Sequence, residues 1–145
     1  MTQALRDATA TQAFGRQLAL RLPAGSILLL AGDLGAGKTC LVQGLAAGLG
    51  IEEPITSPTF ALAQHYPLTP SGGLVHLDLY RLELAAADEL FAQEEEEARA
   101  LGALLAVEWP ERLSSAPAGC WQIQLSLSDP FNPEAGRLIE VRSPS

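Results

Sequence analysis

Residues 32–39 read GDLGAGKT and directly follow the apolar run SILLLA at residues 26–31. The octet matches G-x-x-x-x-G-K-[ST], a pattern that binds nucleotide phosphates when an apolar strand precedes it and a helix follows. Lys38 is the only lysine in the chain, which otherwise uses arginine for positive charge. A lysine carries a compact charge on a thin stem, whereas the broad guanidinium of arginine does not fit the same slot between phosphates. The octet therefore predicts a phosphate-binding loop.

The other residues of the octet suit the same chemistry. Gly32, Gly35 and Gly37 let the backbone wrap closely around a phosphate with its N–H groups pointing inward, and the positive end of the next helix adds to the attraction. Thr39 offers a hydroxyl to Mg²⁺. We expect the nucleotide to be ATP, because guanine readers use an Asn-Lys-x-Asp motif and the single asparagine, Asn132, is not near the single lysine.

The segments on both sides of the octet alternate between strand and helix patterns. Residues 26–31 are typical of a strand buried on both faces of a parallel sheet. The sequence predicts helices at residues 7–22, 39–50 and 85–101, and further strands at 60–66, 74–82, 103–109, 121–127 and 137–142. The last two are predicted to be antiparallel. We therefore expect an α/β fold of the P-loop NTPase type, with a mostly parallel central sheet flanked by helices and antiparallel C-terminal strands, in a single domain over residues 1–145.

Composition narrows the functional classes. The chain is 48% hydrophobic and 18% charged, which excludes a disordered or fibrous protein. A net charge of −8 disfavours unaided binding to nucleic acid. Cys40 and Cys120 do not form a disulfide framework, and no apolar run approaches the ~20 residues of a membrane span. We expect a soluble, cytoplasmic protein with no membrane partner.

A P-loop nucleotidase also needs acidic groups near the phosphates. Asp78 and Glu108 lie at the carboxyl ends of two apolar strands, where a parallel sheet places its ligand crevice. His76, Tyr80 and Trp109 flank them, and Trp109 is a candidate wall of the nucleotide site. The pattern does not decide which of the two acids contacts Mg²⁺ directly.

Three further segments have alternative readings. The loop TSPTF at residues 56–60, with Thr59, either orders around the γ-phosphate or is an ordinary capped loop. Cys40 follows Thr39 at the start of a helix, where it either lies at the nucleotide or simply packs. The run Glu94–Glu97 is expected to be a solvated helix face, with partner docking as the alternative.

Taken together, these motifs resemble the TsaE (YjeE) family of small bacterial P-loop ATPases. The resemblance rests on GDLGAGKT, SPTF, HLDLYRLE followed by DELF, and VEWPERL, in the order and spacing of the family, and on an N-terminal ATQAFGRQLA. It covers about residues 8–140. One departure is the stretch AQEEEEARALG after DELF, where the family usually has a glycine-containing segment.

The resemblance implies roles for individual residues. Ala36, Gly37, Lys38 and Thr39 would hold phosphates, and Thr39 with Glu108 would hold Mg²⁺. Thr11 would contact the nucleotide, Asp78 would have a catalytic or water-positioning role, and Arg137 in GRLIEV matches a family arginine near the base.

The resemblance also implies a function. The protein would be an ATPase that assists the TsaB and TsaD proteins in making threonylcarbamoyladenosine, reaching tRNA only through that complex. Its hydrolysis is expected to be weak without these partners. Two other functions stay open: a nucleotide-gated assembly module that needs no hydrolysis, and a small-molecule kinase, for which the residues after Thr39 leave little room.

Overall fold

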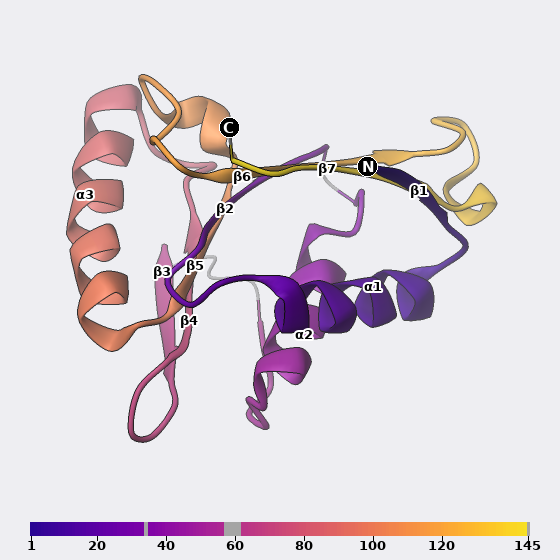
Figure 1. Cartoon of the computed structure of the whole chain (residues 1–145). Helices are drawn as coiled ribbons and strands as arrows, with labels where there is room; N and C mark the ends of the chain where they lie inside the picture. Colours follow the sequence, from indigo (N-terminus) through magenta and orange to yellow (C-terminus); the bar gives the residue numbers. More distant parts are fainter. Residues whose placement is uncertain (34, 57–61, 145) are drawn as a thin grey trace.

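The computed structural model describes residues 1–33, 35–56 and 62–144 (Figure 1). Its strands form one seven-stranded sheet in the order β1-β7-β6-β2-β5-β4-β3. The strands are β1 Thr2–Leu5, β2 Ile27–Ala31, β3 Ala63–Pro67, β4 Gly73–Asp78, β5 Leu104–Glu108, β6 Trp121–Leu127 and β7 Arg137–Arg142. The helices are α1 Ala8–Arg21, α2 Lys38–Leu49 and α3 Leu84–Leu101, with short 3-10 turns η1 Pro110–Arg112 and η2 Pro133–Ala135.

The four central strands, β6, β2, β5 and β4, are mutually parallel. Strand β2 lies between β5 and β6, so that its carboxyl end and the loop that follows lie at the middle of one sheet edge. Strands β3, β7 and β1 are antiparallel to their neighbours. The predicted fold class, including the antiparallel C-terminal pair, is confirmed.

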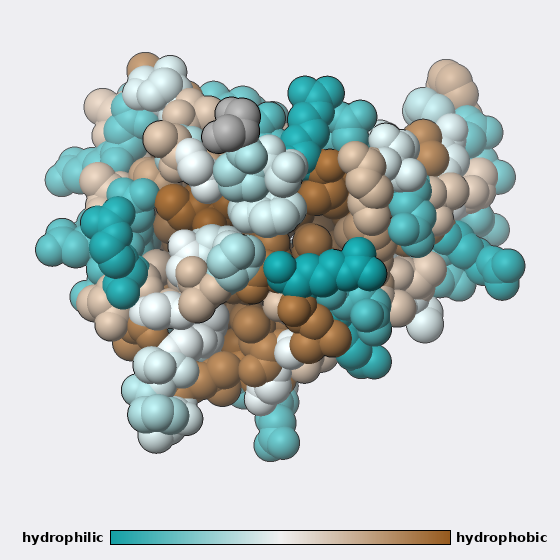
Figure 2. Space-filling model, in the orientation of Figure 1, coloured by the Kyte–Doolittle hydropathy of each residue, from teal (hydrophilic) through white to brown (hydrophobic). Residues whose placement is uncertain are grey.

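Helices cover the sheet on both faces. In Figure 1, α1 and α2 pack together on one face and α3 covers the other. Leu28 and Leu30 of β2 join the core beneath α1 and α2, whereas Leu29 between them joins the core beneath α3. This is why the strand is leucine-rich rather than alternating. In the same orientation, Figure 2 shows apolar residues gathered in the middle of the molecule and hydrophilic ones mainly toward its rim.

The helix ends follow the expected signals. Asp7 is the N-cap of α1: its side chain accepts a hydrogen bond from Ala10 N, and the helix begins directly after it. Helix α2 ends at Gly50, whose φ of 88° is left-handed. No described helix is long and apolar enough to cross a membrane.

The structure differs from the sequence expectations in three places. The strand expected over residues 74–82 ends at Asp78, and the chain then makes a turn in which Leu82 N donates to Leu79 O. Strand β1 is not predicted, because its four residues carry no alternating apolar pattern; it is held by pairing with β7, with Leu5 opposite Arg137. The run Glu94–Glu97 is not uniformly solvated, since Glu94 is buried and its Oε2 lies 2.6 Å from His65 Nε2 on β3. Helix α3 turns this residue toward the sheet, which a charge pattern alone does not reveal.

Candidate functional site

The loop between β2 and α2 depends on glycine at both ends. Gly32 has a φ of 154°, and a Cβ on it would lie 2.6 Å from the carbonyl oxygen of Leu125 on β6. Gly37, the N-cap of α2, has a left-handed φ of 106°. Only glycine adopts both conformations without strain and permits the close approach to β6. The loop therefore has the bare backbone that a phosphate cradle needs, as the octet predicts.

Lys38 is the first residue of α2 and is only 5% exposed. Its Nζ has no hydrogen-bond partner among the described residues and lies 3.9 Å from the centroid of the Trp109 ring. Burial lowers the pKa of Lys38, while the nearby charges of Glu108 and Asp78 raise it in part. A buried ammonium group without acceptors is a good fit for phosphate oxygens, which supply both the missing hydrogen bonds and negative charge.

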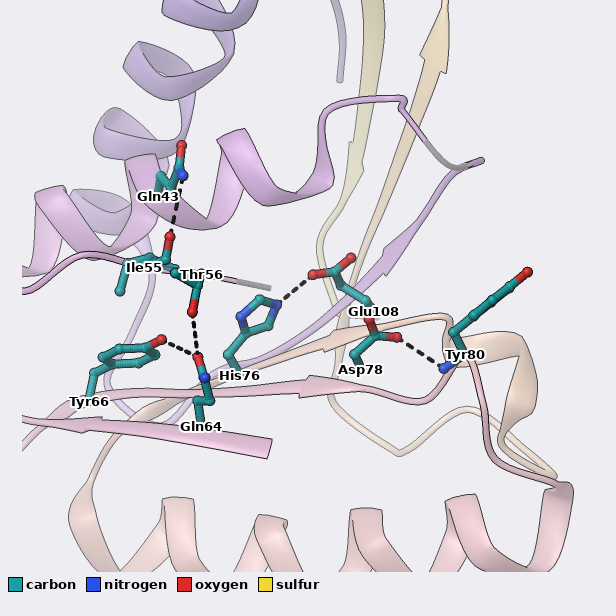
Figure 3. A network of polar contacts seen from close by, with 9 residues as sticks. All are labelled: Gln43, Ile55, Thr56, Gln64, Tyr66, His76, Asp78, Tyr80 and Glu108. Atoms are coloured by element: carbon teal, nitrogen blue, oxygen red, sulfur yellow. Dashed lines mark hydrogen bonds and ion pairs between the residues drawn. The ribbon is translucent and has the colours of Figure 1, made fainter. Parts of the chain in front are cut away.

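The two predicted acids lie side by side at the carboxyl edge of the sheet. Asp78 ends β4 and Glu108 ends β5, and the two residues are opposite each other in the parallel register. Burial raises the pKa of Asp78, and the charge of Glu108 raises it further, although Tyr80 N donates a hydrogen bond of 3.0 Å to Asp78 Oδ1 (Figure 3). Two carboxylates with one buried ammonium group nearby are chemically suited to a divalent cation bound to phosphate.

Glu108 is fixed by a residue whose role the sequence does not indicate. Its Oε2 lies 2.6 Å from Nε2 of His76, which is fully buried (Figure 3). The sequence pattern puts His76 beside the acids without giving it a function. The available signal is its spacing of two residues from Asp78, which puts both side chains on one face of β4.

An aromatic wall closes one side of the site. Trp109 has a left-handed φ of 60°, and its ring lies against the Lys38 ammonium group. The Tyr80 ring lies against it, with centroids 4.7 Å apart and an interplanar angle of 46°. The guanidinium of Arg112 lies 5.8 Å from the Tyr80 centroid. Trp109 therefore directly follows β5 and lies beside the loop lysine. Its role as a wall of the nucleotide site stays a prediction.

Residues distant in sequence lie against Gly37 on the other side of the loop. A Cβ on Gly37 would lie 3.0 Å from Nε of Arg137 and 3.8 Å from Cγ2 of Thr11. Arg137 Nε is buried without a hydrogen-bond partner in the described part of the chain. Thr11 is fully buried, and its hydroxyl donates to Asp7 O at 3.0 Å, which leaves the oxygen lone pairs as acceptors. Both residues thus border the loop at Gly37. The contacts that the resemblance implies for them, Thr11 with the nucleotide and Arg137 near the base, stay predictions.

The remaining predicted site residues lie in the loop, in the first turn of α2, or outside the described residues. The Ala36 side chain packs in the core under the loop, so only its backbone can serve a phosphate. Thr39 and Cys40 occupy the first turn of α2; Cys40 is partly buried and is a free thiol. Gly35 has a left-handed φ of 83° within the loop. Thr59 lies outside the described residues.

Comparison with known proteins identifies the family of this chain. A family model described as "Threonylcarbamoyl adenosine biosynthesis protein TsaE" matches residues 5–133. The chain belongs to the TsaE family. A TsaE protein of Synechocystis sp. is 50% identical over 116 residues, covering 79% of this chain and 73% of the relative. One of Nostoc sp. is 42% identical over 141 residues, covering 94% and 82%. Both carry the name "tRNA threonylcarbamoyladenosine biosynthesis protein TsaE".

A solved structure has the same fold. The crystal structure of Bacillus subtilis YdiB superposes with a TM-score of 0.75 at 27% identity, covering 100% of this chain and 86% of that one. Membership of the TsaE family makes this chain a P-loop nucleotide-binding protein. In this TsaE chain, the glycine loop and the buried Lys38 have the chemistry that suits phosphates, and the Thr39 hydroxyl and the Glu108 carboxylate are groups that could hold a divalent cation.

The raised pKa of Asp78 has a measurable consequence. Because its folded-state pKa is raised, the ionised carboxylate destabilises the folded chain, and this penalty disappears as pH falls toward the ordinary value of 3.8. We expect Asp78→Asn to raise the free energy of unfolding at pH 7 by about 0.5–1 kcal/mol, since a partly exposed charge is screened. Urea unfolding at several pH values between 7 and 4 should show the gain shrinking as pH falls. The exposed Glu97→Gln is the control, and a less stable Asp78→Asn protein at pH 7 would contradict the sign.

Proposed function

We propose that this protein is an ATP-binding and ATP-hydrolysing subunit that assists a TsaB–TsaD complex in the threonylcarbamoylation of the adenosine beside the tRNA anticodon. The observation that carries the proposal is the state of Lys38 Nζ, which is buried without a hydrogen-bond partner among the described residues. It lies near Asp78 and Glu108, at the carboxyl ends of β4 and β5. The names of the relatives supply the pathway. We expect a protein that serves tRNA modification to act in the cytoplasm.

Each residue has a distinct task in this proposal. The backbone from Gly35 to Thr39 binds the phosphates, and Lys38 neutralises charge that develops during phosphoryl transfer. Thr39 and Glu108 hold Mg²⁺, which when bound supplies charge neutralisation at the phosphate oxygens. Asp78 orients the attacking water and takes its proton, a task to which a raised pKa is suited.

The proposal also assigns work to partner proteins. The net charge of −8 repels a phosphate backbone, so that contact with tRNA falls to the complex. We expect slow hydrolysis by the isolated chain, because a cationic group supplied in trans accelerates many P-loop enzymes by ~10³–10⁵. Fast turnover by the isolated protein would contradict this dependence on partners.

Asp78→Asn tests whether hydrolysis is needed. We expect the variant to bind ATP and the TsaB–TsaD pair but to lose at least about 100-fold in turnover, as when a general base is removed. Threonylcarbamoyladenosine should then form once per complex and stop, measured by nucleoside mass spectrometry over time. Glu97→Gln, which removes an exposed charge on α3, should behave as the parent protein. Sustained modification by Asp78→Asn would favour the nucleotide-gated assembly module instead.

A further inference from the structure

We propose that His76 is a positioning residue that holds Glu108 away from Lys38, so that both charged groups stay available to the nucleotide and its cation. The proposal rests on the proposed function for the identity of the ligand. It concerns the arrangement of the site before the ligand arrives, and this arrangement can be measured without nucleotide.

The first support is the place of His76 in the sheet. It lies on β4 between Gln64 of β3 and Ala106 of β5, and it is fully buried. A carboxylate only accepts hydrogen bonds, so the 2.6 Å contact requires His76 Nε2 to donate to Glu108 Oε2. The Glu108 side chain is 5% exposed, so water competes little with this bond. The other carboxylate oxygen points away from His76 (Figure 3).

The second support is the unused nitrogen of the same ring. His76 Nδ1 is buried and has no hydrogen-bond partner in the described ranges 1–33, 35–56 and 62–144. An apolar side chain would fill this core position without leaving a polar atom unpaired. Packing therefore does not account for a histidine here, whereas its bond to Glu108 does.

The third support is that Lys38 and Glu108, both described residues, form no ion pair. Glu108 is the charge that raises the pKa of Lys38 most, so the two groups are close. A carboxylate and an ammonium in a buried setting attract strongly. Yet no ion pair joins these two described residues: Nζ lies against the Trp109 ring and Glu108 bonds to His76. The hydrogen bond from His76 to the Glu108 carboxylate explains this separation.

Loss of the hydrogen bond between His76 and Glu108 has a predictable result. In His76→Leu the carboxylate of Glu108 is free to turn and pair with Lys38. ATP must then break this pair before Lys38 can bind phosphate, and Mg²⁺ finds its ligand misoriented. Removing a residue that orients a metal ligand typically weakens metal binding by about 10–100-fold. His76→Gln, whose amide nitrogen can donate from a similar position, is expected to keep the parent arrangement.

The single lysine allows a direct measurement on the nucleotide-free protein. After isotope labelling of lysine, NMR shows one lysine side-chain signal, that of Lys38, whose shift reports the Trp109 ring beside it. Trp109→Leu gives the reference without the ring. We expect the His76→Leu signal to move toward this reference and the His76→Gln signal to stay. In the double variant His76→Leu/Glu108→Gln no ion pair can form, so the signal should return. Cooperative urea unfolding of each variant shows that it is folded.

Titration with ATP provides the second readout. Without Mg²⁺, His76→Leu is expected to bind ATP about 10-fold more weakly and the double variant to recover, since the competing carboxylate is gone. The Mg²⁺ concentration for half-saturation should rise in both. An unchanged Lys38 signal in His76→Leu, or a double variant that does not recover, would overturn the role of His76. Failure of the parent protein to bind ATP would overturn the proposed function, while the nucleotide-free signal still decides the role of His76.

Discussion

Lys38→Ala is expected to weaken ATP binding by at least about 100-fold, because a charge-assisted hydrogen bond to phosphate contributes about 1.5–3 kcal/mol and a lysine ammonium group can donate more than one. The structure leaves its Nζ buried and without a hydrogen-bond partner among the described residues, which is the state that a phosphate would complete. Isothermal titration calorimetry with ATP and Mg²⁺ measures the effect directly.

Lys38→Arg separates the effect of side-chain shape from the effect of charge. It keeps the charge, but the broad planar guanidinium differs in shape from the ammonium group that lies buried 3.9 Å from the Trp109 ring centroid. We expect a loss nearly as large as with alanine. Arg99→Ala, which removes an exposed partner of Glu95 on α3, is the matched control and should bind as the parent protein. Retained affinity in Lys38→Arg would contradict the geometric argument, and retained affinity in Lys38→Ala would contradict the phosphate site itself.

Gly44→Ala is expected to give the largest loss of stability. Gly44 lies in the middle of α2 where α1 packs against it, and a Cβ there would lie 2.1 Å from the carbonyl oxygen of Gln12. The obstructing atoms belong to the α1 backbone, so the helices must separate. Helix propensity alone would favour alanine by about 1 kcal/mol. A net loss of about 2–3 kcal/mol, measured by urea unfolding, therefore identifies the clash.

Gly50→Ala is the control for this substitution. Gly50 lies at the end of the same helix, and a Cβ on it would meet no described atom within 4 Å, but its φ is 88°. The variant should lose only about 1 kcal/mol from left-handed strain. Equal losses for Gly44→Ala and Gly50→Ala would show that close packing of α1 on α2 is not what requires glycine. Because α1 also carries Thr11, we expect Gly44→Ala to weaken ATP binding as well.

The parts of the site that depend on local pattern could be predicted from the sequence. The octet, the strand before it and the helix after it are contiguous, so periodicity and glycine placement are sufficient. Asp78 and Glu108 can be located because the carboxyl ends of parallel strands share one edge. These positions follow from the fold class and need no knowledge of side-chain contacts.

The contacts that join distant segments are not predictable in the same way. The bonds of His76 to Glu108 and of His65 to Glu94 depend on strand register and helix rotation, which no local pattern records. Strand β1 forms because β7 offers it a partner, not because its own residues favour a strand. Family resemblance assigns Thr11 to the nucleotide and Arg137 to the neighbourhood of the base, and the structure adds that both side chains lie against Gly37.

The position of β2 within the sheet affects the order in which the site can be completed. Its neighbours, β5 and β6, follow it in the chain by a long interval, and Arg137 comes later still, at the start of β7. During synthesis the octet therefore leaves the ribosome well before the strands that flank it exist. Contacts of such long sequence separation form slowly. The nucleotide-binding loop is thus made early, and a nascent chain cannot have a complete nucleotide site until β5, β6 and the start of β7 have been made and have joined the sheet.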